Sequence, residues 1–425
     1  MHSPTSRLDL PDFRRPMTRL PIQLLNSLKW LAILVPVAVA VGSTSAFFLW
    51  ALDAVTLLRF ANPGLLFLLP VAGLCVGVIY QLYGKSAAAG NNLLLAEIHQ
   101  PGAGVPRRMA PLILLGTLIT HLFGGSAGRE GTALQMGGSI AAAFARFLKL
   151  DPAKVRILLM AGVAAGFGSI FGTPVAGAVF ALEVLIVGRV QYDALIPCFF
   201  AALLADWTCR AWGIGHTHYL VNVVSAGLLP NLWLMGKVMM AAIVFGLASS
   251  LFATLYHRLG AIFQTSISRP ELRPVVGGFL VIGLFFIAGT GDFLGLGVLG
   301  DRPDAITLPA LFTSKEIPVT AWAWKLLFTV ITLSAGFKGG EVTPLFFIGA
   351  ALGNTLALAL GAPIDLFAAL GFVAIFAGAT NTPLASTFLG IELFGAGNGI
   401  YIATTCLIAY HCSGSKGIYT AQRQL

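Results

Sequence analysis

Charged residues are scarce in this sequence. Asp, Glu, Lys and Arg together make up 10% of its 425 residues, whereas soluble domains carry about 25%. Hydrophobic residues make up 57% of the chain, and the mean hydropathy is +0.86. This composition excludes an ordinary soluble domain. Alternating segments of about ten residues, the mark of a transmembrane barrel, are also missing. The sequence therefore predicts an all-α membrane protein with many helices.

Cysteine is scarce as well, and its pattern excludes a zinc site. The chain has five cysteines, an odd number, and most of them lie inside apolar runs. No pair has the short spacing that structural zinc sites use. We interpret them as small buried hydrophobic residues and expect neither a metal nor another cofactor. The five are Cys75, Cys198, Cys209, Cys406 and Cys412.

The net charge of +9 does not indicate nucleic-acid binding, because part of it is concentrated before the first apolar run. By the positive-inside rule this cluster places the N-terminus in the cytoplasm. The apolar run that follows, residues 31–52, is too long for the core of a signal peptide. The clustered residues are Arg7, Arg14, Arg15, Arg19 and Lys29.

Glycine and proline, in contrast, are frequent, with 49 and 22 copies. They interrupt the apolar segments, many of which are shorter than the roughly 20 residues of a perpendicular span. Short, interrupted segments indicate discontinuous helices that end within the membrane. We expect a cytoplasmic segment at 1–27, membrane repeats at 28–212 and 232–412, a connecting loop at 213–231, and a short polar tail at 413–425 without a soluble regulatory domain.

The second half of the chain repeats the first. Residues 128–132, Gly-Arg-Glu-Gly-Thr, align with residues 339–343, Gly-Gly-Glu-Val-Thr. Repeats of this kind often meet around a site near the middle of the membrane. Other pairs fall at matching positions: Gly138 with Gly349, Thr173 with Thr382, and Glu183 with Glu392.

Four polar, glycine-flanked breaks each come just before an expected helix. A helix start offers free N–H groups and a partial positive charge, so four inward-facing starts would hold an anion. Such binding is weak enough for release, as transport requires. The breaks are residues 90–92, 128–132, 338–344 and 397–401.

Glu130 is the residue that we expect to act. An ionisable residue at membrane depth is costly and is a functional-site hypothesis by default. A carboxylate among anion-binding N–H groups can occupy the anion's position and, once protonated, move aside. Glu130 would then be both gate and proton carrier. The alternative is that it caps its helix or pairs with Arg129. Tyr401 could donate its hydroxyl to the anion, although a core or interfacial tyrosine is nearly as good a reading.

These motifs resemble the CLC family of chloride channels and anion/proton antiporters. The resemblance rests on residues 128–132, on residues 340–344, on Tyr401 and on the paired repeats, and it covers nearly the whole membrane region. It implies a bundle of tilted and discontinuous helices built from two inverted repeats. It also implies a homodimer with one pore per subunit, in which Glu130 is the external gate.

The departures from the usual chloride pattern resemble the bacterial fluoride-exporting branch of that family. Asn91 stands where a central serine is usual, and Thr132 replaces a proline. The internal proton-transfer glutamate of the chloride antiporters falls on Val184, and one pore aromatic falls on Leu94. The residues that this resemblance assigns to the anion are Asn91, Gly128, Arg129, Gly131, Thr132, Val342, Thr343, Phe347 and Tyr401.

The resulting expectation is a fluoride/proton antiporter of the bacterial inner membrane, not an enzyme. Its partners are fluoride, protons, the lipid bilayer and a second copy of the chain, with no nucleic acid. The first alternative is a CLC protein that carries chloride or another halide, by channel or exchange.

Several weaker signals remain. Gly124-Gly-Ser126-Ala-Gly128 matches the nucleophile elbow of hydrolases, so an intramembrane hydrolase using Ser126 is a remote alternative. His216 and His218 could bind a metal but are more often solvated. Lys338 lies near the ion path or reaches an interface. Glu183 and Glu392 are read as structural, and the role of Glu341 stays open.

Overall fold

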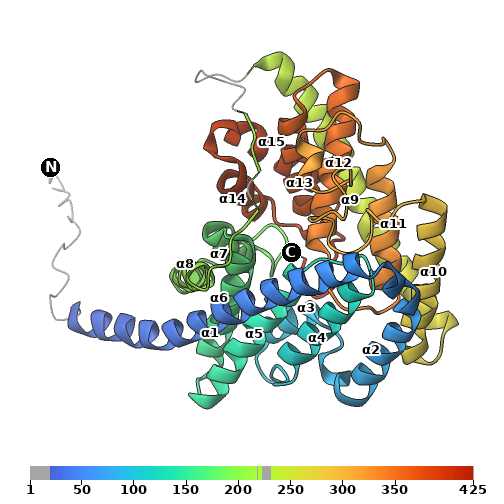
Figure 1. Ribbon diagram of the computed structural model, residues 1–425. Coiled ribbons are helices and arrows are strands. Elements are labelled where there is room, and N and C mark those ends of the chain that lie inside the picture. The colour runs from blue at the N-terminus through green and yellow to red at the C-terminus, as the bar shows by residue number, and fades with distance from the viewer. Residues whose placement is uncertain (1–19, 218, 223–230, 425) are drawn as a thin grey trace, which may run out of the picture.

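The computed structural model describes residues 20–217, 219–222 and 231–424. Within these ranges the fold has fifteen α-helices and no strand (Figure 1). Seven of the described helices are long and apolar enough to cross a membrane. The predicted all-α membrane fold is therefore confirmed. The basic cluster at residues 7–19 and His218 lie outside the described residues.

The first half of the chain forms eight helices, in the lower and front part of Figure 1. The first of them has 42 residues, so it is much longer than one perpendicular span. Others have only nine or ten residues, as interrupted apolar segments predict. The eight are α1 (Leu20–Ala61), α2 (Leu69–Tyr83), α3 (Asn91–His99), α4 (Met109–Leu122), α5 (Glu130–Phe147), α6 (Pro152–Phe171), α7 (Pro174–Glu183) and α8 (Leu195–Ala211).

The second half forms seven helices, and the last five follow the order of α4 to α8. A glycine-rich stretch precedes both α5 and α12, and a Thr-Pro step begins both α7 and α14. The seven are α9 (Leu232–Ser266), α10 (Arg273–Ala288), α11 (Ala321–Ser334), α12 (Val342–Leu360), α13 (Ile364–Thr380), α14 (Pro383–Phe394) and α15 (Gly399–Ser413).

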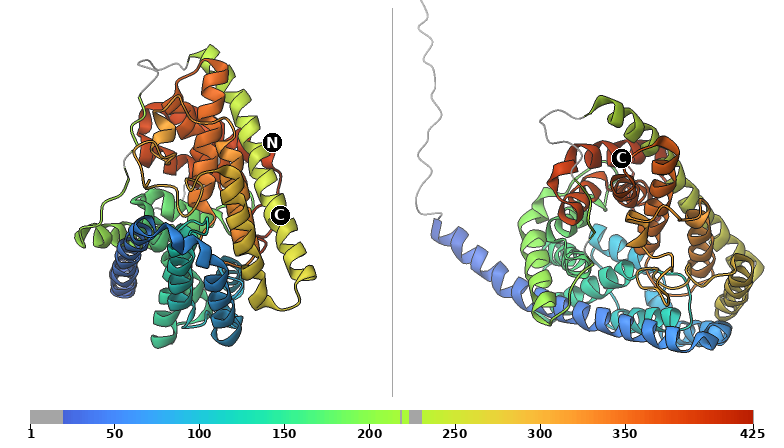
Figure 2. Two further views of the ribbon diagram at one scale, coloured as in Figure 1. Left: turned by 45° about the vertical axis from the view of Figure 1, so that its right-hand side comes forward. Right: turned by 45° about the horizontal axis from the view of Figure 1, so that its top comes forward.

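Glycines bring the backbones of two equivalent helix pairs into close contact. On α5 and α6, a Cβ atom at Gly137 or at Gly162 would collide with the other glycine's carbonyl oxygen. On α12 and α13, Gly349 and Gly371 face each other in the same way. Small residues at such crossings allow the close approach that drives helix packing in membranes. Around these crossings α6 and α13 are buried almost completely. Figure 2 shows the two halves of the chain packed against each other, the first in blue to green and the second in yellow-green to red.

Two glutamates join the halves reciprocally. Both Glu183 carboxylate oxygens accept N–H groups at the start of α14, from Leu384 at 3.0 Å and Ala385 at 2.8 Å. Glu392 does the same at the start of α7, where Val175 and Ala176 donate at 3.0 and 2.7 Å. Each carboxylate therefore satisfies free N–H groups of a helix in the other half. This mutual capping is the arrangement that an inverted repeat predicts.

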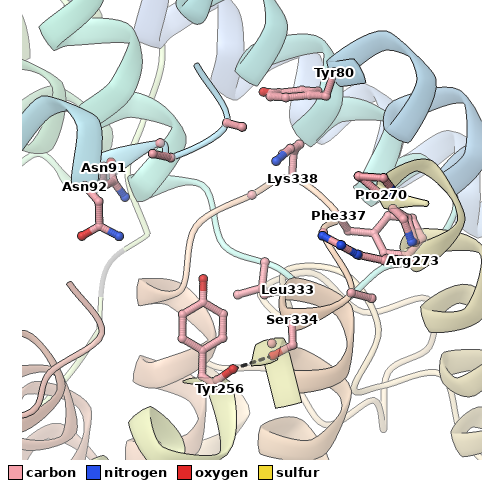
Figure 3. Close-up of a pocket in the computed structure, with 18 of the residues that line it drawn as sticks. Tyr80, Asn91, Asn92, Tyr256, Pro270, Arg273, Leu333, Ser334, Phe337 and Lys338 are labelled. Carbon is pink, nitrogen blue, oxygen red and sulfur yellow. Dashed lines mark hydrogen bonds between the residues drawn. The ribbon is translucent and has the colours of Figure 1, made fainter. Parts of the chain in front are cut away.

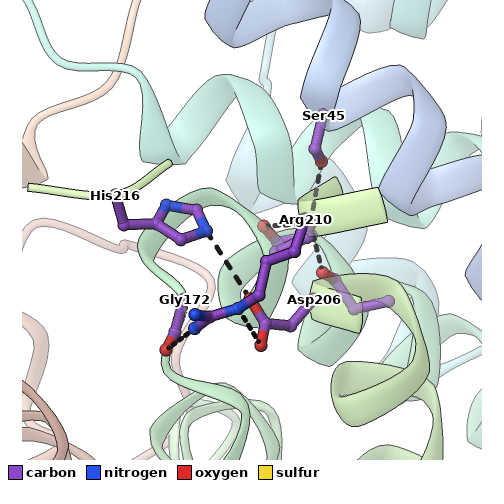
Figure 4. A network of polar contacts seen from close by, with 8 residues as sticks. Ser45, Gly172, Asp206, Arg210 and His216 are labelled. Carbon is purple, nitrogen blue, oxygen red and sulfur yellow. Dashed lines mark hydrogen bonds and ion pairs between the residues drawn. The ribbon is translucent and has the colours of Figure 1, made fainter. Parts of the chain in front are cut away.

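The polar loop after α8 is held against that helix by His216. His216 Nε2 lies 3.5 Å from Asp206 Oδ1, and Arg210 Nε donates to the same carboxylate at 3.0 Å (Figure 4). Arg210 also donates to the Gly172 carbonyl at the end of α6. Among the described residues, no group of three or more His, Cys, Asp or Glu could hold a metal. His216 therefore fixes the loop against α8.

The short segment after α15 is partly buried. It turns back into the bundle, where Ile418 and Tyr419 are buried. Ile418 N–H donates to the Ala379 carbonyl at 2.8 Å, and Ala421 N–H donates to Asn92 Oδ1 at 3.0 Å. The segment thus connects the end of α13 to the start of α3. Its apolar pair Ile418-Tyr419 is the sequence signal for this burial.

Candidate anion pathway

Two glycine-rich loops cross at the centre of the candidate site. Gly128 and Gly340 exchange two backbone hydrogen bonds, with N···O distances of 2.6 and 2.8 Å, in an isolated antiparallel bridge. Each loop leads directly into a helix, α5 at Glu130 and α12 at Val342. The crossing therefore brings the two helix starts together, as the repeat alignment predicts. Backbone outside helical geometry persists at this depth because it is buried in protein.

The Glu130 side chain lies at the start of α12. Its Oε2 accepts the Thr343 N–H at 3.0 Å, and its Oε1 accepts the Thr343 hydroxyl in a short hydrogen bond. Oε2 also accepts the Arg129 N–H at 3.1 Å. The carboxylate is fully buried. Both oxygens of this side chain therefore occupy the donor-rich start of a helix, the kind of place where anions bind in proteins.

The neighbouring residues differ in how they face this carboxylate. Arg129 is 14% exposed, and its Nε lies 3.6 Å from Glu130 Oε1 without any hydrogen-bond partner among the described residues. Thr132 points elsewhere, because its hydroxyl lies 2.7 Å from the Thr117 hydroxyl on α4. Val342 is the buried first residue of α12. Arg129 therefore adds positive charge beside Glu130, and the Thr132 hydroxyl connects α5 to α4.

A third helix start reaches the same place. Gly90, with φ of +57°, begins α3 and directs Asn91 toward Gly131. A Cβ atom on Gly131 would lie 3.1 Å from Asn91 Nδ2 and 3.3 Å from Glu341 Oε2. The site therefore has no room for a side chain at Gly131. The starts of α3, α5 and α12 converge here, as expected from three of the four glycine-flanked breaks.

The fourth break, which includes Tyr401, makes its hydrogen bonds elsewhere. The start of α15 contacts the other end of the bundle, where Asn398 Nδ2 donates to the Asn222 carbonyl at 2.9 Å. The Tyr401 hydroxyl accepts the Asn231 N–H at 3.0 Å, just before α9. A different tyrosine, Tyr419, lines a cavity together with Asn91 and Glu341. Its buried hydroxyl has no hydrogen-bond partner among the described residues.

Phe347 lies on α12 beyond Thr343. It follows Thr343 by one turn of α12 and is fully buried. Its ring lies 6.3 Å from that of Phe293, edge to face, and the Lys325 ammonium lies 5.4 Å from its centre. Lys325 donates in turn to the carbonyls of Phe293 and Gly295, at 3.1 and 2.8 Å. Lys325, a buried lysine that the sequence analysis did not single out, thus fixes the 293–297 loop next to Phe347.

A small apolar hollow lies on the inner side of Asn91. Leu94, Val184 and Tyr419 line it together with other apolar residues. No carboxylate lines this hollow, because Val184 stands there and Glu183 caps α14. Glu341 instead lines a neighbouring cavity of about 760 Å³ together with Tyr256. An acidic residue is therefore present close to Gly131, but on the other repeat.

Comparison with known proteins agrees with this geometry. Residues 72–414 match the family described as voltage gated chloride channel. The chain belongs to this family. A chloride/fluoride channel protein of Pseudomonas syringae pv. tomato is 48% identical over 397 residues, which is 93% of this chain and 86% of that protein.

Solved structures of the chloride channel family share the fold. A CLC-type fluoride/proton antiporter superposes with a TM-score of 0.89 at 33% identity, covering 94% of this chain and 99% of that one. A slow cyanobacterial Cl⁻/H⁺ antiporter gives 0.77 at 21% identity, covering 92% and 96%. The second likeness supports the fold alone.

Membership of the chloride channel family and the local structure both exclude the hydrolase reading. Ser126 lies between helices α4 and α5, whereas a nucleophile elbow needs a preceding strand. Its hydroxyl lies 2.9 Å from the Thr329 hydroxyl, and its N–H donates to Thr332. Ser126 therefore joins the loop to α11. The chain is an ion transporter and not an enzyme.

Proposed function

We propose that this protein exchanges fluoride for protons and exports fluoride from the cytoplasm, with Glu130 as gate and proton carrier. The observation that carries the proposal is the Glu130 carboxylate held by the Thr343 N–H and hydroxyl at the start of α12. Protonation removes the charge that these donors stabilise, so the side chain leaves and the same donors become available to an anion. One site then alternates between proton and anion.

Fluoride is favoured over chloride by the donors around this site. Fluoride is small and strongly hydrated, so its water must be replaced by strong hydrogen-bond donors. The Thr343 hydroxyl and N–H already bind an anionic oxygen, and the Asn91 amide lies against Gly131. The names of the Pseudomonas relative and of the antiporter structure both include fluoride, which supports the same choice. Chloride transport is the second candidate, because the Pseudomonas name includes chloride as well.

The proton needs a route to the cytoplasm that does not use Val184. We assign it to Glu341, which lies close to Gly131 and lines the large cavity with Tyr256. A proton leaving Glu130 would pass to Glu341 and then to water in the cavity. The route thus crosses from one repeat to the other at the loop bridge.

The cavity faces the cytoplasm in this proposal. The ends of α2, α3 and α5 lie together, since Arg108 donates to the Tyr83 carbonyl and Arg146 to that of Val105. The connections at this end carry mostly basic residues, which is typical of cytoplasmic loops. They are Lys85, Arg107, Arg108, Lys149 and Arg269. The opposite connection between α10 and α11 carries Asp292, Asp301, Asp304 and Glu316 with Arg302 and Lys315. We expect a homodimer in the bacterial inner membrane, as the family resemblance implies.

The experiment is a flux measurement on purified protein in liposomes. Vesicles loaded with equal fluoride and chloride are diluted into a salt that does not permeate, and ion-selective electrodes follow both anions. We expect fluoride to leave at least about tenfold faster, which corresponds to a modest difference of about 1.4 kcal/mol between the two ions. Equal initial rates would support the chloride candidate instead.

A further inference from the structure

A deep cavity opens below the Glu130 site. Its volume is about 760 Å³, and α2, α3, α9 and the two loops before α10 and α12 contribute to its wall. Figure 3 shows Lys338 inside it, beneath the ring of Tyr80. Glu341, three residues further along the chain, also lines the cavity. The cavity thus leads from the proposed cytoplasmic end to the crossing of the two loops.

Lys338 is held in place by contacts to its stem and not by a charge partner. The stem lies against Gly116 of α4, where an added Cβ would come within 2.8 Å of Lys338 Cγ. The ammonium lies 4.1 Å from the centre of the Tyr80 ring, a cation–π contact. Glycine on one side and an aromatic face on the other form a slot for this side chain.

The Lys338 ammonium has no anionic partner. Among the described residues it makes no hydrogen bond, and no carboxylate lies within 4.0 Å of it. Three other lysines of the membrane region do have partners: Lys154 pairs with Asp151, and Lys237 and Lys325 donate to backbone carbonyls. A half-buried cation in a cavity wall without a counter-charge favours the arrival of an anion.

The surrounding polar groups agree with an anion as occupant. Gln135 and Asn91 line the same cavity and carry amide donors. Arg273 also lines it, and its guanidinium donates to the carbonyls of Ile267 and Gln264 without neutralising its charge. Glu341 is the one acidic residue in the wall among the described residues. The positive groups outnumber it.

We propose that Lys338 forms an inner anion site, at which cytoplasmic fluoride binds before it reaches Thr343. This proposal rests on the proposed function and adds to it a first binding step on the cytoplasmic side. The Tyr80 face and the Gly116 slot keep the ammonium at the cavity wall, so an anion meets it on the way to Asn91. Lys338 thereby raises the local fluoride concentration without belonging to the gate.

The test compares Lys338→Met with Lys85→Met in liposomes. Lys85 lines the same cavity but is exposed to water, so its charge is screened. Fluoride efflux and proton uptake are measured at graded luminal fluoride. We expect Lys338→Met to raise the half-saturating fluoride concentration about tenfold, the usual effect of losing a contact to a charged group. The limiting rate and the proton-to-fluoride ratio stay unchanged, and Lys85→Met behaves as wild type.

The outcomes separate the two proposals. If wild type shows no proton movement driven by fluoride, the proposed function fails. If wild type exchanges normally and Lys338→Met keeps the same half-saturating fluoride concentration, only the inner site is refuted. A lysine side chain that extends into water without binding fluoride would give this result. Should Lys338→Met not fold, Gly116→Ala displaces the lysine with its charge retained, and it must raise the half-saturating concentration for the proposal to stand.

Discussion

Glu130→Gln is expected to abolish proton movement while fluoride still crosses the membrane. Glutamine has nearly the shape of glutamate but cannot carry a proton. Its NH₂ group would also oppose the N–H donors of Arg129 and Thr343, which now bind Oε2 at 3.1 and 3.0 Å. The side chain is then held less firmly over the anion position. Fluoride should leave liposomes at a measurable rate, with a proton-to-fluoride ratio near zero.

A matched control for this variant is Glu97→Gln on α3. Glu97 is also buried, but its carboxylate accepts the Gly102 N–H at 2.8 Å and does not contact the gate. Its removal should leave the ratio of protons to fluoride as in wild type. Coupled exchange that survives Glu130→Gln would mean that another group carries the proton and that Glu130 only caps α5.

The second large effect concerns stability. Replacing Glu183 by glutamine removes one of the two oxygens that accept N–H groups at the start of α14, and it places an NH₂ group against a donor. Losing a charge-assisted hydrogen bond and leaving a buried N–H unpaired costs about 2–4 kcal/mol. Glu392→Gln should act in the same direction at α7 but more weakly, because Glu392 is less buried.

The stability change is measured as the shift in the unfolding midpoint of the detergent-solubilised protein. Glu316→Gln is the control, since Glu316 is exposed in the loop before α11. The double variant should lose less than the sum of the two single losses, because both caps hold the same contact between α7 and α14. Unchanged midpoints in both single variants would show that the reciprocal caps do not stabilise the joined repeats.

Much of the fold and of the loop crossing at Glu130 could be predicted from the sequence because local signals determine them. Glycine-flanked breaks mark helix starts, and the structure begins α3, α5 and α12 at Asn91, Glu130 and Val342. The alignment of the two halves predicts that equivalent loops meet, which the bridge between Gly128 and Gly340 shows. These features depend on residues close together in the chain or on repetition of a pattern.

Other features depend on contacts between segments that are distant in the chain, and no local sequence pattern predicts such contacts. Tyr401, like Asn91, belongs to a glycine-flanked break at a helix start. Its hydroxyl nevertheless accepts the Asn231 N–H. Tyr419 reaches the site because the chain turns back after α15. The matched glutamates Glu183 and Glu392 were recognisable as a pair, but their mutual capping of α14 and α7 requires the packed halves.

The central claim is that one carboxylate exchanges a proton for fluoride, and an uphill proton measurement tests it most directly. Wild-type protein is placed in liposomes loaded with fluoride, at equal pH inside and outside and with the membrane potential clamped. A pH electrode then records the outer solution as fluoride leaves. The account predicts that protons enter the vesicles against the gradient they build, in fixed proportion to the fluoride released. Fluoride release without any change in outer pH would contradict it and would make the protein a channel.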